Sequence, residues 1–346
     1  MVGAAANWRD FIAPEVGSVT VGEWVEVDLN HLRDAGSVSV NDIAESWRQY
    51  LQAINPDASM RSLCRREAMA YFRWLRHQSE AKGSPAPATI HKHHSLLRAS
   101  VRRAMALGYI EANPFAEWPR GVLPERRPLI ERSELSLSPH DISRLLSLRT
   151  IPAVRRTFYA FAFGTGARIG ELFEMRFSDL RIMPGRTGLT VCRAYSQKRK
   201  QVGATKTRSS AVIPLHPVLE EMVGELWART WRDGFGRTPQ QGDPLFPRLW
   251  LNEVRHQYQG TALELWKQDL AAIEMAPRPF HCTRHTFMSL ARGAGCDVDM
   301  IDSLIHPKSR NNTRTGYGIW PWETLCAEVE KLPISRVREA EQLILV

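Results

Sequence analysis

Two short motifs each place an arginine where a helix is expected to begin. In the first, Gly164-Thr165-Gly166-Ala167-Arg168-Ile169-Gly170-Glu171, a glycine-rich turn leads into a helix whose first turn holds Arg168. A helix start favours phosphate through its free N–H groups, and a planar guanidinium suits two phosphate oxygens. Glu171, one turn later, can hold the arginine in place. Taken alone, the motif also fits an ordinary helix with an Arg168–Glu171 ion pair.

The second arginine motif is His281-Cys282-Thr283-Arg284-His285. Its i,i+3 spacing puts His281 and Arg284 on one face of a helix start. His281 and His285 stand four apart, which is also a spacing of metal ligands. No matching pair of cysteines or carboxylates stands out elsewhere in the sequence. We therefore expect no metal site, and we interpret His285 as a core-packed or hydrogen-bonded residue.

Lys206 lies in the segment Ala204-Thr205-Lys206-Thr207-Arg208, between two expected strands. A lysine on a β-hairpin can reach into a minor groove, and with a lowered pKa it can protonate a leaving oxygen. Lys198 and Lys200 are rivals for that role. The alternative interpretation is a solvated hairpin lysine with no part in chemistry.

The last motif contains Leu304-Ile305-His306-Pro307 and, after a short interval, Thr313-Arg314-Thr315-Gly316-Tyr317. A tyrosine in such a place is ordinarily a core or surface residue. A correctly placed tyrosine oxygen is nevertheless a competent covalent nucleophile. No other tyrosine lies between His306 and residue 346, so Tyr317 is the candidate nucleophile.

In chain order these motifs read Arg-x-x-Glu, Lys, His-x-x-Arg, His and Tyr, and the set resembles the tyrosine recombinase, or phage integrase, family. The resemblance covers residues 37–330. It implies a mainly α fold with a small β-sheet. In that fold a helical, SAM-like core-binding domain precedes a mixed α/β catalytic domain of the tyrosine-recombinase type. Each motif is short, but the ordered set is specific.

The resemblance also implies roles for single residues. It implies that Arg168 and Arg284 clamp the scissile phosphate and that Tyr317 is the nucleophile. It further implies that Lys206 is the general acid, that His281 and His306 assist proton transfer and charge stabilisation, and that Glu171 supports the site.

Two features depart from the family. The family usually has Leu-Gly-His where this chain has Leu304-Ile305-His306, and the interval from His306 to Tyr317 is longer than usual.

By the same resemblance the chain is a site-specific DNA recombinase, or integrase, that breaks and rejoins DNA through a 3′-phosphotyrosine without metal, ATP or another cofactor. The implied partners are double-stranded DNA with inverted-repeat core sites and further copies of the chain in a tetramer on DNA. Accessory DNA-bending or directionality proteins are additional candidates. Three alternatives stay open: a type IB topoisomerase-like relaxase, a non-catalytic DNA-binding protein that keeps the fold, and a metal-dependent nuclease or transposase. The last would need an acidic cluster, and none stands near the motifs.

Proline- and glycine-rich stretches divide the sequence between the motifs. We expect five parts: an acidic N-terminal segment of unknown role (1–36), a helical core-binding domain (37–118), a basic linker (119–137), a catalytic domain (138–330) and a C-terminal tail (331–346). The tail, with the helix before it, is expected to dock on a neighbouring subunit.

Hydrophobic spacing and turn residues predict the main elements. A β-like stretch is expected at Ser18–Val27. Helices are expected around residues 43–51, 59–78 and 89–106, from Ser138 with Pro139 at the first helical position, and again from Thr261. Strands are expected at 188–195 and 210–215, on either side of a basic hairpin.

The charge is unevenly distributed. The chain has a formal net charge of +9, whereas residues 1–36 carry two arginines against six acidic residues, which is −4. The other 310 residues therefore carry +13, a balance that favours a polyanionic partner such as nucleic acid. Ten basic residues are candidate DNA contacts, with a solvated surface as the alternative for each: Arg61, Arg65, Arg73, Arg76, Lys92, Arg98, Arg102, Arg103, Arg126 and Arg127.

Composition argues against membrane and extracellular classes. No apolar run approaches the ~18 residues that a membrane span requires. Five cysteines lack paired spacing, which is typical of a reducing compartment. We therefore expect a cytoplasmic protein of a bacterium or phage, associated with the nucleoid, with no membrane partner.

Overall fold

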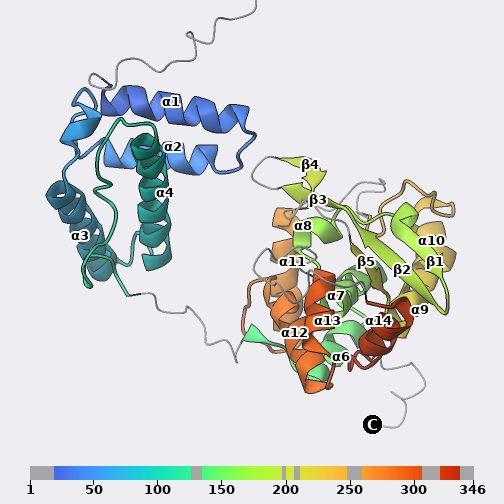
Figure 1. The fold of residues 1–346 in the computed structure, drawn as a ribbon. Helices are drawn as coiled ribbons and strands as arrows, with labels where there is room; N and C mark the ends of the chain where they lie inside the picture. Colours follow the sequence, from blue (N-terminus) through green and yellow to red (C-terminus); the bar gives the residue numbers. More distant parts are fainter. Residues whose placement is uncertain are drawn as a thin grey trace, which may run out of the picture. The chain divides into compact units, whose positions relative to one another are not determined.

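A computed structural model of the chain describes residues 19–125, 135–196, 200–205, 211–247, 259–305 and 320–335. The chain divides into two compact units, Met1–Leu129 and Ile130–Val346 (Figure 1). Five residues of the predicted sites lie outside the described residues: Arg126, Arg127, Lys206, His306 and Tyr317.

The first unit is helical. Its described elements are α1 (Val21–Asp34), α2 (Val40–Tyr50), the 3₁₀ turn η2 (Met60–Ser62), α3 (Arg65–Lys82) and α4 (Pro87–Ala106). They pack around one apolar core that contains Trp24, Trp47, Phe72 and Leu97, each at most 1% exposed. The helix predicted at residues 59–78 corresponds to α3, which starts later, at Arg65, and ends later, at Lys82. Gly83, with a left-handed backbone, caps its end.

Helix α1 contradicts the predicted β-like stretch at Ser18–Val27. Thr20 caps the helix through its hydroxyl, and Glu23 returns the bond to the Thr20 backbone. The buried side chains of α1, Val21, Trp24, Val25, Asp28 and Leu29, recur at helical spacing. Several β-branched valines suggested a strand, but the N-terminal cap and the burial of side chains at helical spacing favour the helix. Residues 19–34 consequently belong to the first unit's core and do not form a separate acidic segment.

A buried carboxylate joins α1 to α4. Asp28 is 1% exposed and accepts hydrogen bonds from Ser100 at 2.6 Å and from the Nε and Nη2 atoms of Arg103 at 2.5 and 2.7 Å. The indole nitrogens of Trp24 and Trp47 donate to the same Ser100 hydroxyl, at 3.3 and 2.9 Å. A buried charge must stay paired, so Arg103 has a structural role, and its contact with DNA stays a prediction.

The second unit combines helices with two small sheets. Its first described elements are α6 (Pro139–Ser147), α7 (Ala153–Thr165), α8 (Ile169–Leu172), η3 (Phe177–Asp179), β1 (Leu180–Met183), β2 (Arg186–Val191), β3 (Arg193–Ser196), β4 (Gln201–Ala204) and β5 (Ala211–Pro214). They are followed by α9 (Pro217–Glu225), the π-helical turn η4 (Leu226–Thr230), α10 (Trp231–Phe235), α11 (Gln259–Ala272), α12 (Cys282–Gly293), α13 (Val298–Ile305) and α14 (Trp322–Glu330). The overall class, mainly α with little β, is as predicted.

The strands form an antiparallel sheet in the order β1-β2-β5 and a separate β3-β4 hairpin. The predicted strand at 188–195 is divided at Cys192, which lies between β2 and β3. Helix α7 forms the centre of the unit, because nearly every residue from Thr157 to Thr165 is buried. The predicted helix start at Ser138 is confirmed, with Pro139 in the first turn and a capping box to Asp141.

The predicted linker 119–137 is anchored at both of its described ends. Val122, 1% exposed, belongs to the core of the first unit, and Arg76 donates to the Gly121 carbonyl. Leu137, 3% exposed, belongs to the core of the second unit, and its amide donates to Thr286 at 3.0 Å. Packed residues thus extend into the stretch that composition marked as poor in core residues.

Helix α14 and the residues after it pack on their own unit. Val329, Leu332 and Ile334 are at most 4% exposed in its core. The Ile334 side chain lies so close to Gly164 in α7 that a Cβ there would be 3.1 Å from it. Residues 322–335 therefore contribute to the core of their own unit, and residues 336–346 lie outside the described residues. Docking of this region on a neighbouring subunit stays a prediction.

None of the helices in the described ranges combines the length and apolar composition that crossing a membrane requires.

His93 gives the first unit a predicted dependence on pH. Burial, followed by the charge of His94, lowers the pKa of His93 from 6.5 to about 4, and its Nε2 has no hydrogen-bond partner. Below pH 6.5 the unfolded chain binds a proton at this residue that the folded chain binds only near pH 4. The free energy of unfolding should therefore fall between these values, by about 2 kcal/mol at pH 5.

Urea unfolding of the full chain at pH 7 and pH 5 measures this loss. His93→Phe should remove most of it, because the variant has no proton to bind. His77→Gln is the matched control, since the side chain of His77 is 66% exposed. Equal losses in the unchanged chain and in His93→Phe would contradict the prediction.

Candidate functional site

The turn between α7 and α8 is shaped by a glycine that no other residue can replace. Gly166 ends α7 with φ 61°, in the left-handed region. A Cβ at this position would lie 2.6 Å from the Phe287 ring on α12 and 3.0 Å from Ile305 at the end of α13. The turn can therefore approach both helices only because the residue is glycine.

Arg168 follows this turn and caps α8. Its amide donates to Glu171 Oε2 at 2.8 Å, and its Nη1 donates to Glu171 Oε1 at 2.9 Å. Glu171 is 5% exposed, whereas the Arg168 side chain is 28% exposed. Glu171 thus holds the arginine from the protein side, as the sequence predicts, and leaves part of the guanidinium open to solvent.

Arg284 joins three segments of the second unit. It is 6% exposed, and it donates to the carbonyl of Gly166 at 2.8 Å and to that of Ile305 at 2.9 Å. Burial, and after it the charge of Arg168, lowers the pKa of Arg284 to about 10. Glu171 and Asp302 act in the opposite direction. The two predicted arginines are therefore close enough to repel each other.

His281 precedes α12 and belongs to the same cluster of charges. Partial desolvation lowers its pKa below 6.5, and His285, Arg284 and Arg168 add to the effect. Of the sequence-predicted catalytic residues, the structure thus brings together Arg168, His281 and Arg284, with Glu171 behind them. Ile305, the residue before His306, also contacts Arg284.

His285 is exposed, so its predicted place in the core is wrong. Helix α12 buries Cys282, Arg284 and Phe287, and His285 shares the outer face with His281. The two imidazoles meet edge to face with centroids 5.2 Å apart. Within the described ranges, no group of three or more His, Cys, Asp or Glu residues is arranged to hold a metal ion.

The cluster brings two guanidinium groups and an imidazole together near the turn at Gly166. Glu171 is bonded directly to Arg168, and the charges of Glu171 and Asp302 also act on Arg284. Burial is the largest cause of the lowered pKa values of Arg284 and His281, and the neighbouring positive groups lower both further. An anion with several oxygens would favour the charged form of each group by accepting charge-assisted hydrogen bonds.

The β3-β4 hairpin leads toward Lys206. All four residues of β4 are exposed, but Thr205, directly before Lys206, is 4% exposed. Of the rival lysines, Lys200 begins the return of the hairpin with φ 51°, and Lys198 lies outside the described residues. The base of β3 is held by Arg193, whose Nη2 lies 2.5 Å from Asp179 Oδ2. Sequence analysis missed this pair, because 14 residues separate its members.

The candidate DNA contacts of the first unit fall into two groups. Arg61, Arg73, Arg98 and Arg102 are exposed, and their side chains make no hydrogen bond or ion pair with other described residues. The others have partners: Arg65 donates to the Glu117 carbonyl, Arg76 to that of Gly121, and Lys92 lies 3.1 Å from Asp42. The first group is the better set of candidates.

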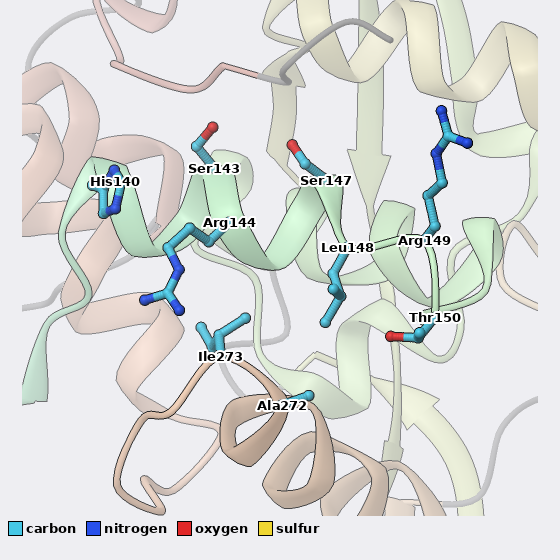
Figure 2. Close-up of a pocket in the computed structure, with 9 residues that line it drawn as sticks. All are labelled: His140, Ser143, Arg144, Ser147, Leu148, Arg149, Thr150, Ala272 and Ile273. Atoms are coloured by element: carbon cyan, nitrogen blue, oxygen red, sulfur yellow. The ribbon is translucent and has the colours of Figure 1, made fainter. Parts of the chain in front are cut away.

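A shallow pocket elsewhere in the second unit does not have the character of a reactive site. It lies between α6 and the end of α11 and includes none of the predicted catalytic residues. Figure 2 shows Arg144 pointing toward Ile273, whereas Ser147 and Arg149 point away from it. The polar groups therefore do not converge on one ligand.

Two family models match the chain. The model of the phage integrase family matches residues 136–317, and that of the phage integrase SAM-like domain matches residues 20–120. No curated protein sequence matches it.

Several solved structures share the fold. The Tn1549 transposon integrase in complex with transposon right-end DNA is 18% identical, over 91% of this chain and 99% of its own, with a TM-score of 0.64. A lambda integrase dimer bound to a core site is 19% identical, over 87% of this chain and 100% of its own, with a TM-score of 0.59. A lambda integrase tetramer bound to a Holliday junction is 20% identical, over 90% of this chain and 84% of its own, with a TM-score of 0.59.

These matches confirm the predicted fold class, a SAM-like helical domain followed by an integrase catalytic domain. They also confirm the resemblance on which the sequence analysis relied. Because the matched region 136–317 covers more than half of its residues, the chain belongs to the phage integrase family, the tyrosine recombinases.

Proposed function

We propose that the chain is a recombinase that breaks and rejoins DNA through a 3′-phosphotyrosine. Membership of the integrase family supports the broader role, site-specific DNA recombination. The observation that supports the proposal most is that Arg284 is bonded to the Gly166 turn, two residues before Arg168, so that the two guanidinium groups lie close together. Phosphoryl transfer depends mainly on positioning and on neutralising the phosphate oxygens, which such a pair can do.

The proposed reaction assigns one step to each group. Tyr317 Oη attacks the scissile phosphorus while Arg168 and Arg284 bind the non-bridging oxygens. The bond from phosphorus to the 5′ oxygen breaks, and Lys206 gives that oxygen a proton. His281 and His306 assist charge stabilisation and proton transfer, in which one of them takes the proton that Tyr317 Oη loses, and Glu171 supports Arg168. The 5′-hydroxyl of a second strand then attacks the phosphotyrosine, its proton passes to Lys206, and Tyr317 leaves and regains its own proton, so the reaction needs neither ATP nor a metal.

The partners are proposed from the same comparison. Lambda integrase has been solved as a tetramer on a Holliday junction, and the Tn1549 integrase with transposon DNA. We propose that this chain likewise acts as a tetramer on double-stranded DNA with inverted-repeat core sites, in the cytoplasm. The two units, each with its own core, would contact DNA together. Accessory proteins that bend DNA or set direction stay a sequence-based prediction.

The nucleophile can be tested with a nicked suicide substrate that loses a short strand after cleavage. The unchanged chain should form a covalent protein–DNA adduct in EDTA, and Tyr317→Phe should bind the DNA but form none, because it lacks the attacking oxygen. Denaturing gels score the adduct. A persisting adduct in Tyr317→Phe would refute the assignment. No adduct with either protein would favour a non-catalytic DNA-binding role, and relaxation of supercoiled DNA without strand exchange would favour the topoisomerase-like alternative.

Glu171 is expected to affect cleavage without touching DNA. Glu171→Gln keeps the shape of the side chain but weakens two bonds to Arg168. Since a hydrogen bond to a charged group contributes ~1.5–3 kcal/mol, single-turnover cleavage should slow by about 10- to 100-fold while DNA affinity stays nearly constant. Glu264→Gln is the control, because Glu264 forms an exposed i,i+3 pair with Lys267. Equal cleavage by both variants would contradict the supporting role.

Arg98 and Arg102 are expected to bind DNA phosphates, whereas Arg103 is expected to stabilise the fold. Arg98→Ala and Arg102→Ala should each weaken binding and reduce the slope of log affinity against log salt by about 0.9, the value for one phosphate contact. Arg103→Ala should instead lower the thermal unfolding midpoint, because it leaves Asp28 buried without its partner. Fluorescence anisotropy between 50 and 200 mM salt gives the slopes, and an unchanged slope in both surface variants would argue against this DNA-binding face.

A further inference from the structure

The hairpin that leads to Lys206 projects from the second unit with few attachments. Strands β3 and β4 pair only with each other and form a sheet apart from β1-β2-β5, within the described residues. Figure 1 shows this hairpin at the edge of the unit, beside α8. Because β4 is exposed along its whole length, the position of the hairpin depends on β3 and on Thr205.

The closest of these attachments is at Gly170. A Cβ on Gly170 would lie less than 3.0 Å from the carbonyl oxygen of Tyr195 in β3, a distance that real Cβ atoms essentially never show. The neighbouring atoms belong to the Tyr195 backbone, so no side chain can rotate to make room. Gly170 has no positive φ, so close approach of two backbones is the physical reason for a glycine here.

A second attachment holds the base of the same strand. Arg193, the first residue of β3, pairs with Asp179, which is 7% exposed and also accepts from the Arg176 amide at 2.9 Å. This pair fixes where β3 starts, and the Gly170 contact fixes how closely its middle approaches α8. Helix α8 in turn begins directly after Arg168.

We infer that Gly170 is a positioning residue: by letting the Tyr195 backbone lie directly on α8, it sets how far the hairpin that leads to Lys206 lies from Arg168. The inference rests on the proposed function, in which Lys206 protonates the leaving 5′ oxygen. Proton transfer requires hydrogen-bond distance, and a displacement of ~1 Å can cost about 100-fold in rate. A side chain at Gly170 would push the hairpin outward and should therefore impair that one step.

The test compares two suicide substrates, one with the normal bridging oxygen and one with sulfur at the 5′ bridging position, which leaves without a proton. Gly170→Ala and the bulkier Gly170→Val are compared with Gly203→Ala, because Gly203 lies in β4 of the same hairpin and a Cβ there meets nothing within 4 Å. Cleavage of normal DNA should slow by about 100-fold in Gly170→Ala and further in Gly170→Val. Cleavage of the sulfur substrate should stay close to that of the unchanged chain, as should both rates in Gly203→Ala.

Lys206→Ala serves as the reference for losing the proton donor. If it is slow on normal DNA and restored by sulfur, and Gly170→Ala behaves alike, the inference holds. If Lys206→Ala is restored but Gly170→Ala is equally slow on both substrates, Gly170 acts through Arg168 or the fold, and the inference is overturned. If sulfur does not restore Lys206→Ala, the proposed general acid itself fails. Normal cleavage by both Gly170 variants would also overturn the inference.

Discussion

The buried guanidinium of Arg284 is the interaction on which the site depends. It is bonded to two backbone carbonyls, at Gly166 and Ile305. These two bonds fix the turn before α8 and the end of α13 at one point, close enough to Arg168 for the two guanidinium charges to interact. The site is therefore organised before any ligand binds, so an anion would bind without the cost of rearranging these groups.

The first unit also contains a buried charge that joins helices. Asp28 is paired with Arg103 and bonded to Ser100, and two tryptophans donate to that same hydroxyl. This network joins α1, α2 and α4 through an ion pair and hydrogen bonds, whereas Arg284 joins its segments through bonds to backbone carbonyls.

Sequence alone predicted the family and the Ser138 helix start, because these rest on local motifs and capping. It could not predict contacts between residues far apart in the chain. The pairing of Arg103 depends on Asp28, 75 residues earlier, and the face on which His285 lies depends on what α12 packs against. The valine-rich start of α1 suggested a strand because the decisive signals, a capping box and burial at helical spacing, compete with β-branched composition. Lys206, His306 and Tyr317 remain predictions.

The packing of Ile334 against Gly164 also bears on the order in which the protein is completed. Gly164 is two residues from the turn that Arg284 grips, and its neighbour in the core belongs to the last described stretch of the chain. Domains form in the order of synthesis, so the first unit can fold while the second is still being translated. The core around the arginines, by contrast, is complete only when residue 334 has left the ribosome. A chain cut short before that point would have the whole core of the first unit but an incomplete core beside Arg168 and Arg284.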